Sequence, residues 1–349
     1  MLQAPFRTLG LFLMLGQRAR ASAGRIYEIF DTEPEIVDRP GAVELDEVTG
    51  RITFDDVHFG YRPSVGAGDG DVADDGDGDA TEGNGAAEHA PPPAVLSGFS
   101  LEIEPGETVA LVGRTGSGKS TVAKLLARFY DVDRGSIRID GHDVRDVTQL
   151  SLRRAVGIVA DEPFLFSVSL ADNIAYGDPT AERQVVEEAA RLAQAHDFVS
   201  DLPGGYDEVV GERGYTLSGG QRQRVALART ALIEPPILVL DDATSALDVH
   251  VEEAILAGLG RPGPTGEGDR PQPGRTTILI AHRLSTIAAA DRVVLLEHGR
   301  VRATGRHGEL MATEPAYAEV LAHLDDAIES EPSGSVPERD PDGVPGGGA

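Results

Sequence analysis

Nine consecutive residues carry the clearest chemical signal in the sequence. They read Gly-Arg-Thr-Gly-Ser-Gly-Lys-Ser-Thr and span 113–121. Glycines let a backbone wrap closely around a ligand and point its N–H groups at phosphate oxygens. Lys119 can reach the β- and γ-phosphates of a nucleotide, and the Ser120 hydroxyl can bind Mg²⁺. The predicted phosphate-binding residues are Gly113, Arg114, Thr115, Gly116, Ser117, Gly118, Lys119, Ser120 and Thr121.

The residues on either side of this loop support the same interpretation. An apolar run at 109–112 leads into the loop, and a helix-like run at 122–129 follows it. A buried strand, a glycine loop and a helix are the setting that phosphate binding requires, because the helix N-terminus adds partial positive charge. The alternative is a plain glycine-rich turn with an exposed lysine. That alternative does not explain why the loop, the lysine, the hydroxyl and the flanking strand and helix occur together.

Two carboxylates end a second apolar run, which reads Ile-Leu-Val-Leu-Asp-Asp at 237–242. An acid at the C-terminal end of a buried strand, beside a phosphate loop, can hold Mg²⁺ through water. We assign that role to Asp241. Without the loop nearby, the pair would read as two acids in a turn.

A third motif, Leu-Ser-Gly-Gly-Gln at 217–221, opens a predicted helix. Ser218 is a good N-cap, and the N–H groups of Gly219 and Gly220 can face an anion. Alone, the motif describes a capped helix start. Together with the other two motifs it indicates a further phosphate contact. Gln221, the last residue of the motif, is assigned to the same contact.

The net charge of −27 is distributed unevenly along the chain. Residues 69–88 hold eight acidic side chains and no basic one, and residues 325–342 hold seven against one arginine. No basic stripe appears, so nucleic acid is not an expected partner. The absence of cysteine excludes disulfides and thiol chemistry, and no apolar run reaches the roughly 18 to 20 residues of a membrane span.

Short apolar strands alternating with helices predict an α/β fold with a largely parallel sheet. One helix is expected over residues 1–30, a short one near 148–155, and mainly helices over 165–233. The expected strands are 51–61, 95–103, 108–112, 136–139, 156–159, 237–240, 277–281 and 292–296. Composition predicts disorder in two insertions, about 64–93 and 260–275, and in the acidic tail 329–349.

These motifs and their order resemble the ATP-binding domain of the ABC transporter family. The resemblance covers about residues 50–325 apart from the two insertions, and the segment Gly-Glu-Arg-Gly at 211–214 is similar to the exporter subclass. It implies a P-loop NTPase core with a mainly parallel sheet, an antiparallel β subdomain and a helical signature subdomain. It also implies ATP and Mg²⁺ as cofactors. The family's motifs correspond to Tyr61 (the aromatic on adenine), 113–121 (Walker A), 217–221 (signature), 237–242 (Walker B), 245–248 (the following loop) and His282 (the switch histidine).

The resemblance extends to residues 1–35, which look like the cytoplasmic end of an exporter's last transmembrane helix and its linker. We therefore expect the chain to begin inside a membrane helix, with the rest of that domain absent, and its ATPase domain to lie on the cytoplasmic face of the plasma membrane. The implied partners are a transmembrane domain and a second ABC half-transporter. In such a pair, Ser218, Gly219, Gly220 and Gln221 would contact a nucleotide held by the partner chain.

Two positions depart from the family pattern. Asp242 stands where the family has a glutamate that orients the attacking water, and Asp161 stands where it has a glutamine beside Mg²⁺. A carboxylate withdrawn by one C–C bond, on the order of 1.5 Å, can cost ~10²-fold in rate. Asp161 is still able to bind Mg²⁺. We therefore favour one half of a heterodimeric exporter, with an intact signature and a degenerate site of its own. The residues assigned to catalysis are Asp242, Asp161 and His282. Those assigned to the metal are Ser120, Asp241 and Asp161.

Other interpretations stay open at this point. One is a homodimeric exporter with two equivalent active sites, and another treats both aspartates as tolerated variants. A non-transport ABC ATPase in translation or DNA repair usually has two cassettes or a long coiled coil, and this sequence shows neither. A soluble interaction module with vestigial ATP binding is the last alternative. The transported substrate cannot be read from these residues.

Overall fold

The computed structural model describes residues 3–31, 33–62, 93–211, 214, 216–259, 274–281 and 283–330. Most of the two expected insertions, His282 and the expected tail beyond 330 lie outside these residues. The chain divides into two compact units, residues 1–38 and 39–349, which are described separately.

The first unit is built on one helix, α1 (Gln3–Phe30), in agreement with the helix expected over residues 1–30. Large apolar side chains along it are exposed, among them Phe12, Leu13, Tyr27 and Phe30. In the part of the chain that the structure describes, no helix combines the length and the apolar character needed to cross a membrane.

The second unit contains a six-stranded sheet in which five strands run parallel. Its strand order is β10-β9-β3-β8-β7-β6, and only the edge pair β10 and β9 is antiparallel. Buried parallel strands are nearly continuous apolar runs, because both faces are covered. The strands are β3 (Thr108–Val112), β6 (Val156–Val159), β7 (Ile237–Asp241), β8 (Thr276–Ile280), β9 (Arg292–Glu297) and β10 (Arg300–Gly305).

A smaller antiparallel sheet with the order β2-β1-β4-β5 completes the β structure. Its strands are β1 (Ile52–Phe59), β2 (Leu96–Ile103), β4 (Arg134–Ile139) and β5 (His142–Asp143). Gly135, at φ +87°, approaches the backbone of Asp56 so closely that a Cβ would overlap it. Glycine is therefore needed there to let β4 pair with the irregular part of β1.

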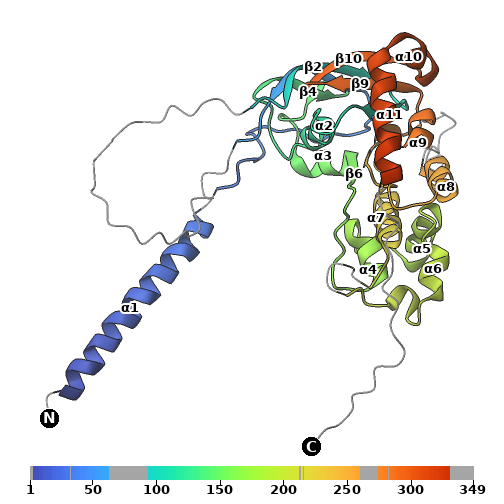
Figure 1. Ribbon diagram of the computed structural model, residues 1–349. Helices are drawn as coiled ribbons and strands as arrows, with labels where there is room; N and C mark the ends of the chain where they lie inside the picture. Colours follow the sequence, from blue (N-terminus) through green and yellow to red (C-terminus); the bar gives the residue numbers. More distant parts are fainter. Residues whose placement is uncertain are drawn as a thin grey trace, which may run out of the picture. The chain divides into compact units, whose positions relative to one another are not determined.

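Helices between β6 and β7 pack on one another rather than on the antiparallel sheet. Figure 1 shows α4, α5 and α6 grouped with α7, away from the antiparallel sheet. They are α4 (Leu170–Ile174), η1 (Ala175–Gly177), α5 (Arg183–Leu192), α6 (His196–Asp201), η2 (Gly205–Asp207) and α7 (Gly219–Ile233). The remaining helices are α2 (Lys119–Leu126), α3 (Gln149–Ala155), α8 (Val249–Leu259), α9 (Leu284–Ala288), α10 (His307–Thr313) and α11 (Pro315–Ser330).

Strand β3 shows how the parallel sheet separates two cores. Val109 and Leu111 pack in one core with α2 and the antiparallel sheet, whereas Ala110 and Val112 pack in the other with the helices around α7. Alternate residues of a strand point to opposite faces, so an entirely apolar strand fits between two layers.

The predicted fold class, a P-loop core with an antiparallel β part and a helical part, is confirmed. The expected strands correspond to observed ones, although β1 ends at Phe59, before Tyr61. The strand expected over residues 51–61 therefore extends past the observed C-terminal end of β1. Strand β10 and helices α8 to α11 were not predicted individually.

Candidate functional site

The predicted catalytic and phosphate-binding segments follow the C-terminal ends of parallel strands. The loop 113–118 follows β3, Asp161 follows β6, and Asp241 and Asp242 lie at the end of β7. Since β3, β6 and β7 belong to one parallel sheet, these ends lie along one edge. The sheet thus brings together groups that are up to about 130 residues apart in sequence (242 − 113 = 129).

Glycines give the loop after β3 its shape. A Cβ on Gly113 would overlap the carbonyl oxygen of Leu296 and lie 2.7 Å from Ser117 Oγ. Gly118 is the N-cap residue of α2 in a left-handed conformation, with φ at 105°. Close backbone approach at the first position and positive φ at the second both require glycine. The loop therefore has the conformation that its sequence predicts.

Lys119 folds back over this loop. Its Nζ donates to the carbonyl oxygens of Gly113 at 2.7 Å and Arg114 at 3.2 Å, and only 6% of the residue is exposed. Burial lowers the pKa of this ammonium, while the charges of Asp241 and Asp242 act in the opposite direction. A buried cation held by carbonyl oxygens is well placed to turn to phosphate oxygens, which are stronger acceptors because they are charged.

Ser120 and Asp241 form the second half of the site. The Ser120 hydroxyl donates to Asp241 Oδ1 at 3.0 Å. Burial raises the pKa of Asp241, and the charge of Asp161 adds to this rise, whereas Ser120 and the two lysines, Lys124 and Lys119, oppose it. One hydroxyl and one carboxylate oxygen are hard ligands that suit Mg²⁺, so the residues present fit this ion. The part of the chain that the structure describes holds no group of three acidic, histidine or cysteine ligands.

Tyr61 lies beside α2, the helix that follows the phosphate loop. Its hydroxyl hydrogen-bonds with Thr121 Oγ1 at 3.1 Å, and its ring meets those of Phe59 and Tyr130 edge-on, at 5.0 and 5.3 Å between centroids. Lys124 Nζ lies 5.8 Å from the ring centre. The ring is thus fixed next to the phosphate loop with part of its surface exposed, as a residue that stacks on a nucleotide base requires.

The two departures from the family pattern lie at the same edge. Asp242 has a left-handed backbone, with φ at 53°, and its N–H donates to the carbonyl oxygen of Ile280 at 3.0 Å. Asp161 Oδ1 accepts a hydrogen bond of 2.9 Å from the Ser245 hydroxyl. Asp161 is therefore engaged with the loop that follows β7. His282 is outside the described residues, so its assignment stays a prediction.

The motif at 217–221 forms the predicted capped helix start. Gln221 N donates to Ser218 Oγ at 3.2 Å, and Ser218 N donates to Gln221 Oε1 at 2.8 Å, which is a capping box. Within the described part of the chain, neither Gly219 N–H nor Gly220 N–H makes a hydrogen bond, and no interaction joins the motif to the phosphate loop.

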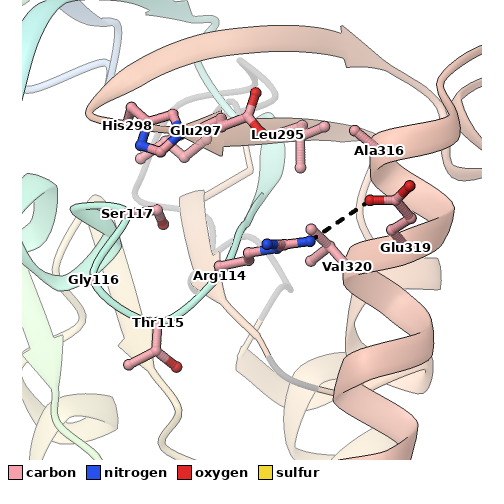
Figure 2. Close-up of a pocket in the computed structure, with 11 residues that line it drawn as sticks. Arg114, Thr115, Gly116, Ser117, Leu295, Glu297, His298, Ala316, Glu319 and Val320 are labelled. Atoms are coloured by element: carbon pink, nitrogen blue, oxygen red, sulfur yellow. Dashed lines mark ion pairs between the residues drawn. The ribbon is translucent and has the colours of Figure 1, made fainter.

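A cavity of about 200 Å³ borders the phosphate loop on the side of β9 and α11. Figure 2 shows Arg114 extending from the loop toward Glu319 of α11, with which it forms an ion pair of 3.6 Å. Both side chains are largely exposed, so this pair contributes little to stability. The contact nevertheless joins α11 to the glycine loop that precedes Lys119.

Residues 96–245 match the model of the ABC transporter family. The chain contains an ABC transporter domain. The ATP-dependent lipid A-core flippase of Syntrophus aciditrophicus is 42% identical over 301 residues, which are 86% of this chain and 44% of the flippase. ATP-binding cassette sub-family B member 6 of Mus musculus is 40% identical over 337 residues, 97% of this chain and 36% of that protein.

A solved structure, a bacterial Atm1-family ABC exporter with ATP bound, also matches the chain. The TM-score is 0.73 and the identity 40%, over 92% of this chain and 50% of that one. This chain therefore spans half or less of the length of these exporters and transporters.

Sequence reasoning missed two residues, Glu252 and Arg283, that fix the loop after β7. Glu252 of α8 is fully buried, accepts hydrogen bonds from Thr244 and Thr286, and lies 3.7 Å from Arg283. Arg283 in turn donates to the carbonyl oxygens of Leu247 and Ser245, both at 2.5 Å. A lone glutamate in a helix reads as a solvated surface residue, so its partners gave no sequence signal.

The raised pKa of Asp241 leads to a prediction for Asp241→Asn. The native state holds this carboxyl proton more tightly than the unfolded chain does, so the ionised form costs stability, and this cost disappears as the pH falls through the raised pKa. Asparagine removes the buried charge. We therefore expect a higher unfolding temperature for the ligand-free variant at pH 7, and Mg²⁺-dependent ATP binding weakened roughly 10- to 100-fold.

Thermal unfolding at pH 5 and 7 and a titration of ATP with and without Mg²⁺ check both parts. Asp201→Asn, on the exposed end of α6, is the matched control and should change neither. A ligand-free Asp241→Asn variant that unfolds at a lower temperature than wild type would contradict the account of the charge.

Proposed function

We propose that this chain is the ATP-binding subunit of an ABC exporter, which binds ATP with Mg²⁺ and couples binding and hydrolysis to export. The observation that carries the proposal is the assembled site at one sheet edge, where Lys119 lies over the glycine loop and Ser120 pairs with Asp241. The similar proteins named above are an ATP-dependent flippase and an exporter with ATP bound, which supports the same activity here.

The second part of the proposal is a two-chain arrangement. The signature 217–221 makes no interaction with its own phosphate loop among the described residues, and the N–H groups of Gly219 and Gly220 are unpaired there. A helix start with unpaired N–H groups favours an anion. A nucleotide held by a second ABC half-transporter supplies that anion, and each composite site then joins one chain's loop to the other chain's signature.

The third part concerns asymmetry between the two sites. Asp242 carries a shorter side chain than the glutamate expected there, and the Asp161 carboxylate accepts a hydrogen bond from Ser245. Both features reduce the ability of this chain to direct a water molecule at ATP. We therefore propose that its own site holds ATP and hydrolyses it slowly, while its signature serves a faster site in a different partner.

The fourth part concerns the membrane. Phe164, three residues after Asp161, is 53% exposed, and Tyr176 of η1 is 57% exposed. Phe166 stacks on Tyr176 with 4.6 Å between ring centroids. Arg229 lies 5.4 Å from the Tyr176 ring and donates to the Phe164 carbonyl oxygen at 3.1 Å, which fixes this group. Exposed, rigid aromatics are typical of a protein interface.

We assign this aromatic group, Phe164, Phe166 and Tyr176, to contact with a transmembrane domain. The exposed apolar residues of α1 support the same location, at the cytoplasmic face of the plasma membrane. The ATP-dependent flippase named above is longer than this chain, and the additional length leaves room for such a domain in a similar protein.

The slow-site proposal predicts the effect of Asp242→Glu. The added methylene moves the carboxylate outward by about one C–C bond, and placement on that scale is worth on the order of 10²-fold in rate. We expect the isolated wild-type chain to bind ATP·Mg²⁺ but hydrolyse it slowly, and the variant to bind equally and hydrolyse faster. Equilibrium binding and phosphate release, measured on the same samples, test this.

The matched control is Lys119→Ala, which should bind no ATP and thereby show that the measured binding occurs at the loop. Wild-type hydrolysis as fast as that of the Asp242→Glu variant would contradict the slow site but leave the ATP-binding function intact. Wild-type binding that persists in Lys119→Ala would contradict the function itself.

The membrane contact can be tested because the chain has no cysteine. A single cysteine in Tyr176→Cys, carrying a photo-crosslinker, should attach to a membrane-spanning protein in native membranes, because the ring lies on the proposed interface. Mass spectrometry identifies the attached protein. Met311→Cys on α10, which is also exposed, should give no such product. Equal attachment at both positions would contradict the interface.

A further inference from the structure

Gln223 is a buried polar residue that the site description leaves without a role. It lies in α7, two residues beyond the signature, and only 3% of it is exposed. Its Nε2 donates to Ser245 Oγ at 2.8 Å and to the Asp161 carbonyl oxygen at 3.3 Å. Its Oε1 accepts from Ala246 N at 3.0 Å. One side chain therefore joins the helix of the signature to the loops after β6 and β7.

The chemistry of its partners fixes the orientation of this amide. A backbone N–H only donates, so Ala246 N requires the oxygen of Gln223, and a backbone carbonyl only accepts, so Asp161 O requires the nitrogen. Both Nε2 hydrogens are then used. Ser245 Oγ accepts one of them, and its own hydrogen is donated to Asp161 Oδ1 at 2.9 Å. The result is a hydrogen-bond chain with one direction, from Gln223 through Ser245 to Asp161.

The two ends of this chain lie at different functional positions. Asp161 follows β6, which pairs in parallel with β7, and Asp241 ends β7, so one end lies at the sheet edge where Mg²⁺ is expected. At the other end, Gly219 is one helical turn before Gln223, on the same face of α7. A Cβ on Gly219 would lie 3.5 Å from Ala246 Cβ, and one on Gly220 would lie 2.8 Å from Ala246 O. The signature glycines therefore pack on the residue that Gln223 holds.

We infer that Gln223 is a positioning residue that couples this chain's own nucleotide site to the signature it presents to a partner. This inference rests on the proposed function. When Asp161 responds to ATP·Mg²⁺, its backbone and carboxylate act on Gln223 and Ser245, and these act on Ala246 and the signature. Gln223 is buried, and its amide oxygen and both of its amide hydrogens are hydrogen-bonded. It therefore has few alternative arrangements, so a displacement at one end is transmitted to the other.

Hydrogen–deuterium exchange of the full chain tests the coupling without requiring activity. In wild type, ATP·Mg²⁺ should slow exchange in the peptide of the phosphate loop, 113–121, and change exchange in the signature peptide, 216–224. In Gln223→Ala the loop should respond as before, while the change at the signature is lost. Energetic coupling between sites typically amounts to at least about five-fold, which sets the size of the expected difference.

Ser245→Ala removes the middle of the chain and should produce the same loss, and combining it with Gln223→Ala should add nothing. Ser245→Thr keeps the hydroxyl and should restore the response. Gln184→Ala, at an exposed glutamine of α5 that donates to Glu188, is the control and should behave as wild type. The unfolding temperature of each variant, measured in parallel, identifies any that does not fold.

The outcomes distinguish the inference from the function on which it rests. A signature response that is unchanged in Gln223→Ala and in Ser245→Ala, with a normal response of the loop, overturns the coupling and leaves the proposed function standing. No response at 113–121 in wild type overturns ATP binding and, with it, the coupling.

Discussion

The site depends on two opposite charges at one edge of a parallel sheet, those of buried Lys119 and half-buried Asp241. Burial lowers the pKa of the lysine and raises that of the aspartate, so the protein environment disfavours both charged forms. Phosphate oxygens are charged partners for the lysine, and Mg²⁺ is one for the aspartate. The ligand-free fold therefore maintains an electrostatic cost, which the proposed binding of ATP·Mg²⁺ would relieve. The glycine loop, β3 and β7 hold the two charges in position.

The loop after β7 is the second point of organisation, because side chains on two sides of it hold it in place. Gln223 of α7 and Asp161 hold Ser245 and Ala246 from one side, while Arg283, itself paired with buried Glu252, holds Ser245 and Leu247 from the other. Such a loop moves with its surroundings and not independently of them. Under the function proposed above, this gives a physical route by which a chain with a slow site still presents a signature that responds to ATP.

The sequence predicted those features that are local in the chain. The phosphate loop, the N-cap Ser218 and the apolar strands β3 and β7 each arise from neighbouring residues, and the structure has them. Strand β10 escaped prediction because it is an edge strand without an apolar run, defined by its pairing with β9. Glu252 and Gln223 escaped because they have partners as far as 34 and 62 residues away, so only the folded chain reveals their roles.

The chemical state of the bound nucleotide tests the central claim most directly. The isolated chain is incubated with ATP and Mg²⁺, separated rapidly from free nucleotide and denatured, and the released nucleotide is identified by chromatography. The account predicts that most of it is ATP, because Lys119, Ser120 and Asp241 bind the phosphates while Asp242 and Asp161 direct water poorly. Recovery of mainly ADP after a brief incubation would contradict a site that holds ATP.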